Sequence, residues 1–87
     1  MSQGPRGGLR GPASAPEGGV LVVEVANGAT TVEVSEAGTS EVTSYPVGPD
    51  GKARIPVHWS GGAMLYVSTG QWPNFEVILV EVISTFR

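Results

Sequence analysis

The sequence predicts an all-β protein, a small antiparallel β-sandwich of about six strands with an extended N-terminal arm. Residues 75–83 form the longest apolar stretch, rich in β-branched side chains and free of glycine and proline. Short alternating segments separated by turn residues precede this stretch, and no segment has a helical period. Because a strand that is apolar on both faces is typical of a central position, we expect residues 75–83 to lie in the middle of the fold. One face would carry Phe75, Val77, Leu79 and Ile83, and the other Ile78, Val80 and Val82.

The first predicted hairpin is centred on Asn27-Gly28, a dipeptide that favours the tight type I′ turn because both positions tolerate a positive φ. Placing this dipeptide in the loop sets Val23 opposite Val32 and Leu21 opposite Val34. The same register sets Val25 opposite Thr30, so that all these side chains share one face. Turn chemistry and apolar alternation therefore agree on this pairing.

The second predicted hairpin joins a strand over residues 41–47 to one that follows Pro49-Asp50-Gly51, with Gly51 in the left-handed position. Tyr45 would then lie opposite Ile55. Val47 would oppose Ala53, Thr43 would oppose Val57, and Pro46, Arg54, Pro56 and His58 would fall on the other face. Since proline cannot donate a ladder hydrogen bond, Pro46 and Pro56 indicate edge positions or bulges.

The third predicted hairpin begins after a turn at Ser60-Gly61-Gly62. Residues 63–68 form its first strand, with Leu65 and Val67 on one face and Met64 and Tyr66 on the other, and residues 69–74 form the loop to the last strand. These elements together predict the buried core. It comprises Val23, Val32, Ile55, Leu65, Val67, Val77 and Leu79.

The first nineteen residues contain six glycines and three prolines, a composition that predicts neither helix nor sheet. We therefore divide the chain into an arm, residues 1–19, and a domain, residues 20–87. The arm is either a disordered leader or a segment that orders on a neighbour through Arg6, Leu9 and Arg10. It carries two arginines and one glutamate, a net +1, against three basic and seven acidic residues in the domain, a net −4. This contrast favours head-to-tail contact between copies, with an arm that is dispensable for folding and needed for assembly.

Composition narrows the classes of function. A domain this short is marginally stable alone, and small domains commonly gain stability from disulfides, metals or partner subunits. The chain has no cysteine and a single histidine, which leaves oligomerisation or docking on a larger surface as the expected reinforcement. A net charge of −3 disfavours nucleic acid as a partner. The sequence also lacks an apolar run of about 18 residues and an apolar signal segment, so it predicts neither a membrane span nor secretion.

A set of short motifs follows the second and third turns. Pro49-Asp50-Gly51-Lys52 leads into residues 53–55, then come Gly61-Gly62, the Tyr66-containing strand and the closing strand over residues 77–80. This pattern resembles prealbumin-like domains, including the carboxypeptidase-regulatory-like sandwiches, in which Asp-Gly-Lys or Asp-Gly-Arg ends one strand and a glycine leads a tyrosine-containing strand. The resemblance spans residues 20–83 and implies an immunoglobulin-like fold without catalytic residues. Members of that family often have a longer first loop, which leaves the strand order open.

The sequence offers little support for a catalytic site or a metal-binding site. His58, Ser60 and Asp50 contain the groups of a nucleophile, base and orienting acid, yet no nucleophile elbow or oxyanion hole accompanies them. We therefore interpret His58 as an exposed edge histidine beside Trp59. The glutamates at 24, 33, 36 and 41 lack an aspartate-rich loop that would gather oxygen ligands for calcium, so they predict a solvated acidic face. We expect no enzyme activity, no cofactor and no metal.

Two functions remain open. The first is a non-enzymatic assembly protein on a virion, a capsid decoration or cement protein that docks in many copies as a homo-oligomer on a shell. Its predicted partner-binding residues are Arg6, Leu9, Arg10, Trp59 and Trp72. The alternative is a carbohydrate- or protein-binding module that uses Trp59, Tyr66 and Trp72, because aromatic faces stack on sugars and also anchor interfaces.

Overall fold

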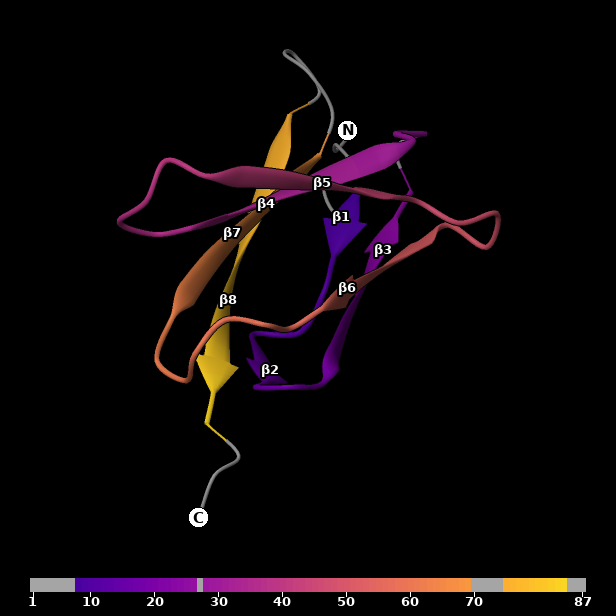
Figure 1. The fold of residues 1–87 in the computed structure, drawn as a ribbon. Helices are drawn as coiled ribbons and strands as arrows, with labels where there is room; N and C mark the ends of the chain where they lie inside the picture. Colours follow the sequence, from indigo (N-terminus) through magenta and orange to yellow (C-terminus); the bar gives the residue numbers. More distant parts are fainter. Residues whose placement is uncertain (1–7, 27, 70–74, 85–87) are drawn as a thin grey trace, which may run out of the picture.

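The computed structural model describes residues 8–26, 28–69 and 75–84. Within these ranges the protein is all-β, with eight strands and no helix (Figure 1). The chain builds a three-stranded sheet in the order β1-β3-β6 and a five-stranded sheet in the order β2-β8-β7-β4-β5. The strands are β1 (Leu9–Arg10), β2 (Ser14–Pro16), β3 (Val20–Val25), β4 (Thr31–Glu36), β5 (Val42–Pro46), β6 (Lys52–Pro56), β7 (Met64–Thr69) and β8 (Glu76–Ile83).

The inner faces of the two sheets pack against each other and form one hydrophobic core. All strand pairs are antiparallel except β2 and β8, which run parallel. Both sheets contribute side chains that are completely or almost completely buried. The largest are Leu21, Val23 and Ile55 from the three-stranded sheet and Val32, Val34, Leu65, Val67, Val80 and Val82 from the five-stranded sheet.

The predicted pairing between the strands on either side of Asn27-Gly28 is wrong. β3 pairs with β1 and β6, whereas β4 pairs with β5 and β7, so the chain passes from one sheet to the other between them. Asn27 lies outside the described residues, and Gly28 does have the expected positive φ, 84°. The inward positions were identified correctly, with Val23 and Val32 both buried. Alternation cannot separate the two arrangements, because side chains on paired strands and on facing sheets point into the same core.

The second predicted hairpin is also wrong in its pairing, although its turn forms. The Gly51 amide donates to the Gly48 carbonyl at 3.0 Å, the Gly48 amide donates to the Lys52 carbonyl at 2.8 Å, and Gly51 has φ 78°. Beyond this turn the strands diverge: β5 joins the five-stranded sheet and β6 the three-stranded sheet, so Tyr45 does not oppose Ile55. A local turn signal therefore fixed the bend and not the partner.

Pro46 and Pro56 lie on edge strands, because β5 and β6 are each the last strand of their sheet. This confirms the prediction of edge positions for both prolines. The amides of Val47 and Val57 donate inward, to Thr30 and Gly19, each at 2.9 Å. Because alternate residues of an antiparallel strand bond on opposite sides, Pro46 and Pro56 occupy positions that point away from the sheet. A proline there removes a free donor from the edge and opposes pairing with another strand.

The third hairpin forms as predicted. β7 and β8 are antiparallel neighbours, and the Ala63 amide donates to the Ser60 carbonyl at 3.1 Å in the turn before β7. Leu65 and Val67 are buried, while Tyr66 is exposed on the other face. Residues 70–74, which include Trp72, lie outside the described residues.

The predicted burial of Val77 and Leu79 is wrong. β8 does lie inside its sheet, between β2 and β7, and Val80 and Val82 on its inner face are fully buried. Its outer face is open, because no third layer built from the described residues covers it: Val77 is 50% and Leu79 49% exposed. A strand with two apolar faces thus has one core face and one surface face in this two-layered fold.

The expectation that residues 1–19 form no sheet is wrong for β1 and β2. β1 pairs with β3, β2 pairs with β8, and Leu9 and Ala15 are each only 3% exposed. The Glu76 carboxylate accepts hydrogen bonds from the amides of Gly8, at 3.1 Å, and Leu9, at 3.2 Å. These strands are held by backbone bonding to established neighbours, which needs no apolar periodicity of their own. Residues 1–7, with Arg6, lie outside the described residues.

Two leucines on neighbouring strands provide a matched test of the burial pattern. Leu65→Ala should lower the free energy of unfolding by about 2–5 kcal/mol, because it removes a side chain with no exposed surface and leaves a cavity. Leu79→Ala should cost less than about 1 kcal/mol, because half of that side chain is already in water. Urea denaturation of both variants measures the difference, and equal losses would contradict the open outer face of β8.

The N-terminal segment should contribute to stability. Leu9→Ala should lower the free energy of unfolding by about 2 kcal/mol or more, since it empties a buried position. Arg10→Ala, at the exposed neighbouring position, should change it by less than about 0.5 kcal/mol. Deleting residues 1–19 removes both strands and should lower the melting temperature more than either substitution. A truncated protein that melts with the full chain would restore the view of this segment as a separable arm.

Candidate functional site

The outer face of β7 and β8 gathers large apolar side chains at the surface. Tyr66 lies directly opposite Leu79, and Val77 lies opposite Ser68 in the same ladder. A row continues across the sheet, because Ser35 opposes both Tyr66 and Val42. We call the exposed apolar residues of this side the apolar face; they are Val42, Tyr66, Phe75, Val77, Leu79 and Ile83. Contiguous exposed apolar surface of this kind marks interaction sites.

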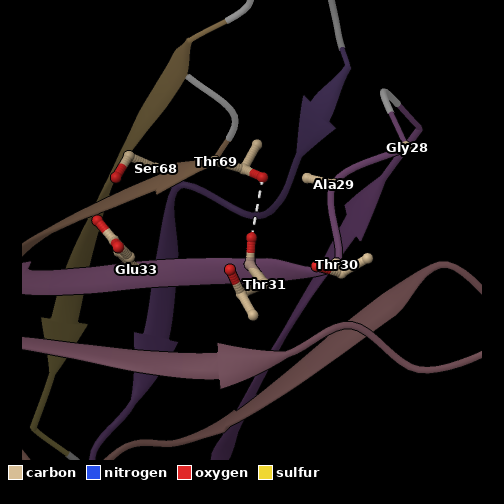
Figure 2. A pocket seen from close by; sticks show the side chains of 7 residues that line it. All are labelled: Gly28, Ala29, Thr30, Thr31, Glu33, Ser68 and Thr69. Carbon is tan, nitrogen blue, oxygen red and sulfur yellow. Dashed lines mark hydrogen bonds between the residues drawn. The ribbon is translucent and has the colours of Figure 1, made fainter.

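A polar groove adjoins the apolar face at the ends of β4 and β7. Its volume is about 450 Å³, and Figure 2 shows the Glu33 carboxylate and the Ser68 hydroxyl at one end of it, with Gly28 and Ala29 at the other. The Thr69 hydroxyl, which is buried, donates to the Thr31 carbonyl at 3.1 Å and ties the two strands together. The lining comprises Gly28, Ala29, Thr30, Thr31, Glu33, Ser68 and Thr69. Hydroxyls and one carboxylate equip this groove for hydrogen bonding rather than for apolar ligands.

A second hollow, of about 430 Å³, lies on the outer side of the three-stranded sheet. Arg10, Glu24 and Lys52 stand in one row across β1, β3 and β6 and line it. Arg54 follows two residues after Lys52 on β6 and is exposed on the same side. Gly11 lines this hollow too, and a Cβ there would come within 2.9 Å of the Val23 and Ile78 side chains. The chain therefore requires glycine where it leaves β1.

The predicted partner-binding residues are not brought together among those described. Leu9 is buried in the core, Arg10 is exposed beside Glu24, and Arg6 and Trp72 lie outside the described residues. Trp59 is half-buried against the core and stacks on His58, with ring centroids 4.0 Å apart. Tyr66 instead points outward from β7. The described aromatics therefore do not form a shared stacking platform.

Sequence reasoning missed the apolar face, although a signal for it was present. The apolar residues of 75–83 occupy both faces of one strand, and a sandwich of two layers can bury only one of them. Apolar residues on the second face of a strand favour a central position in its sheet, which is the interpretation given above. It is equally the signature of a surface that another molecule covers.

The side chains considered above for catalysis and for metal binding are placed as follows in the structure. No group of three or more His, Cys, Asp or Glu side chains within the described ranges could hold a metal ion. The His58 ring is stacked on Trp59, and the Asp50 carboxylate forms an ion pair with Arg54 at 2.9 Å. No helix in the part of the chain that the structure describes is long and apolar enough to cross a membrane.

The turn at Asp50 contains a carboxyl group with a displaced pKa. The hydrogen bonds from Arg54 and from the Lys52 amide lower the pKa of the Asp50 carboxyl and stabilise its charged form. A lowered pKa in the folded state contributes stability above the unfolded-state value, and this contribution is lost as the pH falls through the folded value. Both side chains are exposed, so water screens the pair and its role is local, in closing the turn.

No family model, curated protein or solved structure matches the chain. The resemblance to prealbumin-like domains therefore stays a prediction from the short motifs at residues 49–52, 61–62 and 65–67.

Proposed function

We propose that this protein is a non-enzymatic assembly protein that docks on protein partners through the apolar face. The observation that carries the proposal is the exposure of Tyr66, Val77 and Leu79 side by side on two paired strands. Leaving such side chains in water forgoes about 25 cal/mol for each Å² of apolar surface, which a partner that covers them would recover. Aromatic and aliphatic anchors at the middle of a surface are also typical of interface hot spots.

We infer that the fold is immunoglobulin-like. Read as strands A, A′, B, C, C′, E, F and G, β1 to β8 place A, B and E in one sheet and A′, G, F, C and C′ in the other. The crossings from β3 to β4 and from β5 to β6 then correspond to the B–C and C′–E connections. The inter-sheet disulfide of antibody domains is impossible here, because the chain has no cysteine. Such a fold presents the G and F strands, here β8 and β7, as an open sheet face.

A capsid decoration or cement protein on the virion surface remains our specific proposal for the biological setting. A small domain without cysteine gains stability when its exposed apolar surface is covered in an assembly. Docking in many copies on a shell would also multiply a contact that is weak for each copy. In this proposal the apolar face replaces Leu9 and the N-terminal strands as the docking element, because Leu9 is used inside the core.

Binding of a carbohydrate is a second candidate, favoured by the groove in Figure 2. The hydroxyls of Thr30 and Ser68 and the Glu33 carboxylate offer the donors and acceptors that sugar hydroxyls require. Tyr66 lies two residues before Ser68 on the same face of β7 and could stack on a sugar ring.

Leu79→Asp tests the assembly function. We expect this variant to remain folded, because Leu79 is half exposed, and to lose at least about tenfold in affinity for particles or protein partners through the charge placed in the contact. Cosedimentation with candidate particles and pull-down of partners measure the loss, with circular dichroism as the check on folding.

Ser44→Asp is the matched control. It introduces the same charge on the outer side of the same sheet, at an exposed position on the edge strand β5. This control should bind like the parent protein. Unchanged binding by Leu79→Asp would refute docking through the apolar face.

The carbohydrate candidate is tested by titrating the protein with soluble glycans and following amide NMR shifts. Binding in the groove should move the Ser68 and Thr30 resonances and should weaken in Glu33→Gln, which removes the charged acceptor. Shifts confined to other residues, or none at all with a broad glycan set, would reject this candidate.

A further inference from the structure

We propose that the partner of the apolar face is the outer face of the three-stranded sheet on another copy of this chain, so that copies stack head to tail. The inference rests on the proposed function, since it takes the apolar face as a docking surface and names what covers it. The two surfaces lie on opposite outer sides of the sandwich (Figure 1). One copy can therefore use both at once.

Charge is distributed unequally between these two sides. All three basic residues that the structure describes, Arg10, Lys52 and Arg54, lie on the outer side of the three-stranded sheet. Glu24 stands between Arg10 and Lys52 there and Arg54 is paired with Asp50, so Arg10 and Lys52 supply the positive excess of this side. The outward positions of β4, β5, β7 and β8 include two carboxylates, Glu33 and Glu81, and no basic residue. We call the outer side of β1, β3 and β6 the basic face. Oppositely charged surfaces steer two molecules into register and disfavour contact between like surfaces.

The basic face also offers apolar surface to match. Val20 and Val22 on β3 are exposed there, beside Pro56 on β6. The next row across the sheet places Arg10 and Lys52 on the two sides of Glu24, at one end of this apolar strip. An apolar centre with a cationic rim complements the apolar face, whose centre is Tyr66 and Leu79 and whose flanks carry Glu33 and Glu81.

Contact between two apolar faces is the less favourable arrangement on charge. A two-fold axis through such a contact would bring Glu33 and Glu81 of both copies to one interface, with no described cation from either copy between them. Head-to-tail contact instead places these carboxylates against Arg10 and Lys52. A stack of copies then has one unused face at each end, so the assembly is open unless it closes into a ring.

Growth through the sheet edges is opposed at all four edges that the structure describes. β5 and β6 carry the outward-pointing prolines Pro46 and Pro56, and β1 and β2 have only two and three residues. Contacts between copies are therefore directed to the sheet faces. This removes the commonest competing route by which β-proteins associate.

The size of the smaller surface sets the expected strength. β3 and β6 have six and five residues and β1 only two, so at about 3.3 Å per residue the three-stranded sheet covers at most roughly 20 Å by 15 Å. This footprint is below the roughly 800 Å² per partner of a typical stable interface. We therefore expect weak association of single pairs, visible toward millimolar concentration and strengthened where copies are held in an array.

Two charge-reversal variants provide the test. One combines Glu33→Lys with Glu81→Lys and disables the side with the apolar face; the other combines Arg10→Glu with Lys52→Glu and disables the basic face. All four positions lie at the surface, and Ser40→Lys in the loop between β4 and β5 serves as a control for added charge. Sedimentation equilibrium over rising concentration measures the average mass, and circular dichroism verifies that each variant is folded.

The full chain and the control should grow beyond a dimer as concentration rises, while each double variant alone should associate at least about tenfold more weakly. An equimolar mixture of the two double variants should again grow beyond a dimer, because the unaltered faces pair with each other and the introduced lysines of one variant face the introduced glutamates of the other. Added salt should weaken the parent's association.

Several results would overturn the inference. A full chain that stays monomeric up to millimolar concentration contradicts self-association, and a mixture that associates no better than the separate double variants contradicts pairing of these two faces. If the basic-face variant associates like the parent while Leu79→Asp does not, the apolar face is a docking surface that pairs with something other than the basic face. That last outcome separates failure of this inference from failure of the proposed function.

Discussion

The packing of two inner sheet faces into one core is the constraint on which the rest of this structure depends. Leu21, Val23 and Ile55 from one sheet meet Val32, Leu65 and Val80 from the other, and all are essentially excluded from water. The path of the chain between strands follows from this packing of two sheets. The chain crosses from one sheet to the other after β1, β2, β3, β5 and β6, so that both layers receive the strands that the core needs. Burial of both inner faces outweighs the local preference for hairpins.

The N-terminal strands complete this packing. β1 extends the three-stranded sheet and β2 extends the five-stranded sheet, so a short segment contributes to both layers. Leu9 and Ala15 each place one apolar group in the core, and Glu76 accepts hydrogen bonds from the amides at the start of β1. Gly11 permits the close approach to Val23 and Ile78 that the crossing requires. A segment rich in glycine and proline can thus be structural when its backbone is supplied with partners.

The same two-layered packing creates the candidate functional surfaces. A sandwich buries one face of each sheet, and whatever the outer faces carry is left in contact with solvent. On β7 and β8 the outer positions hold Tyr66, Val77 and Leu79. The described basic residues lie on the outer face of the other sheet. With the edges closed by Pro46, Pro56 and very short strands, the faces are the surfaces available for association. An apolar and a cationic side on one small domain are the basis of our proposals for assembly.

The sequence by itself determined the fold class, the positions of the six strands from β3 to β8, the turns and the inward side of nearly all of these strands. Alternation placed Val23, Ile55 and Leu65 in the core, and glycine at positions 28 and 51 marked bends with a positive φ. These properties depend on neighbours along the chain, which a sequence displays directly. Only the tertiary structure decided which strands pair, that residues 9–16 join both sheets, and that one face of residues 75–83 is surface. Pairing and exposure depend on segments distant in the chain, and an apolar side chain satisfies the same pattern whether it meets its own sheet, the opposite sheet or a partner.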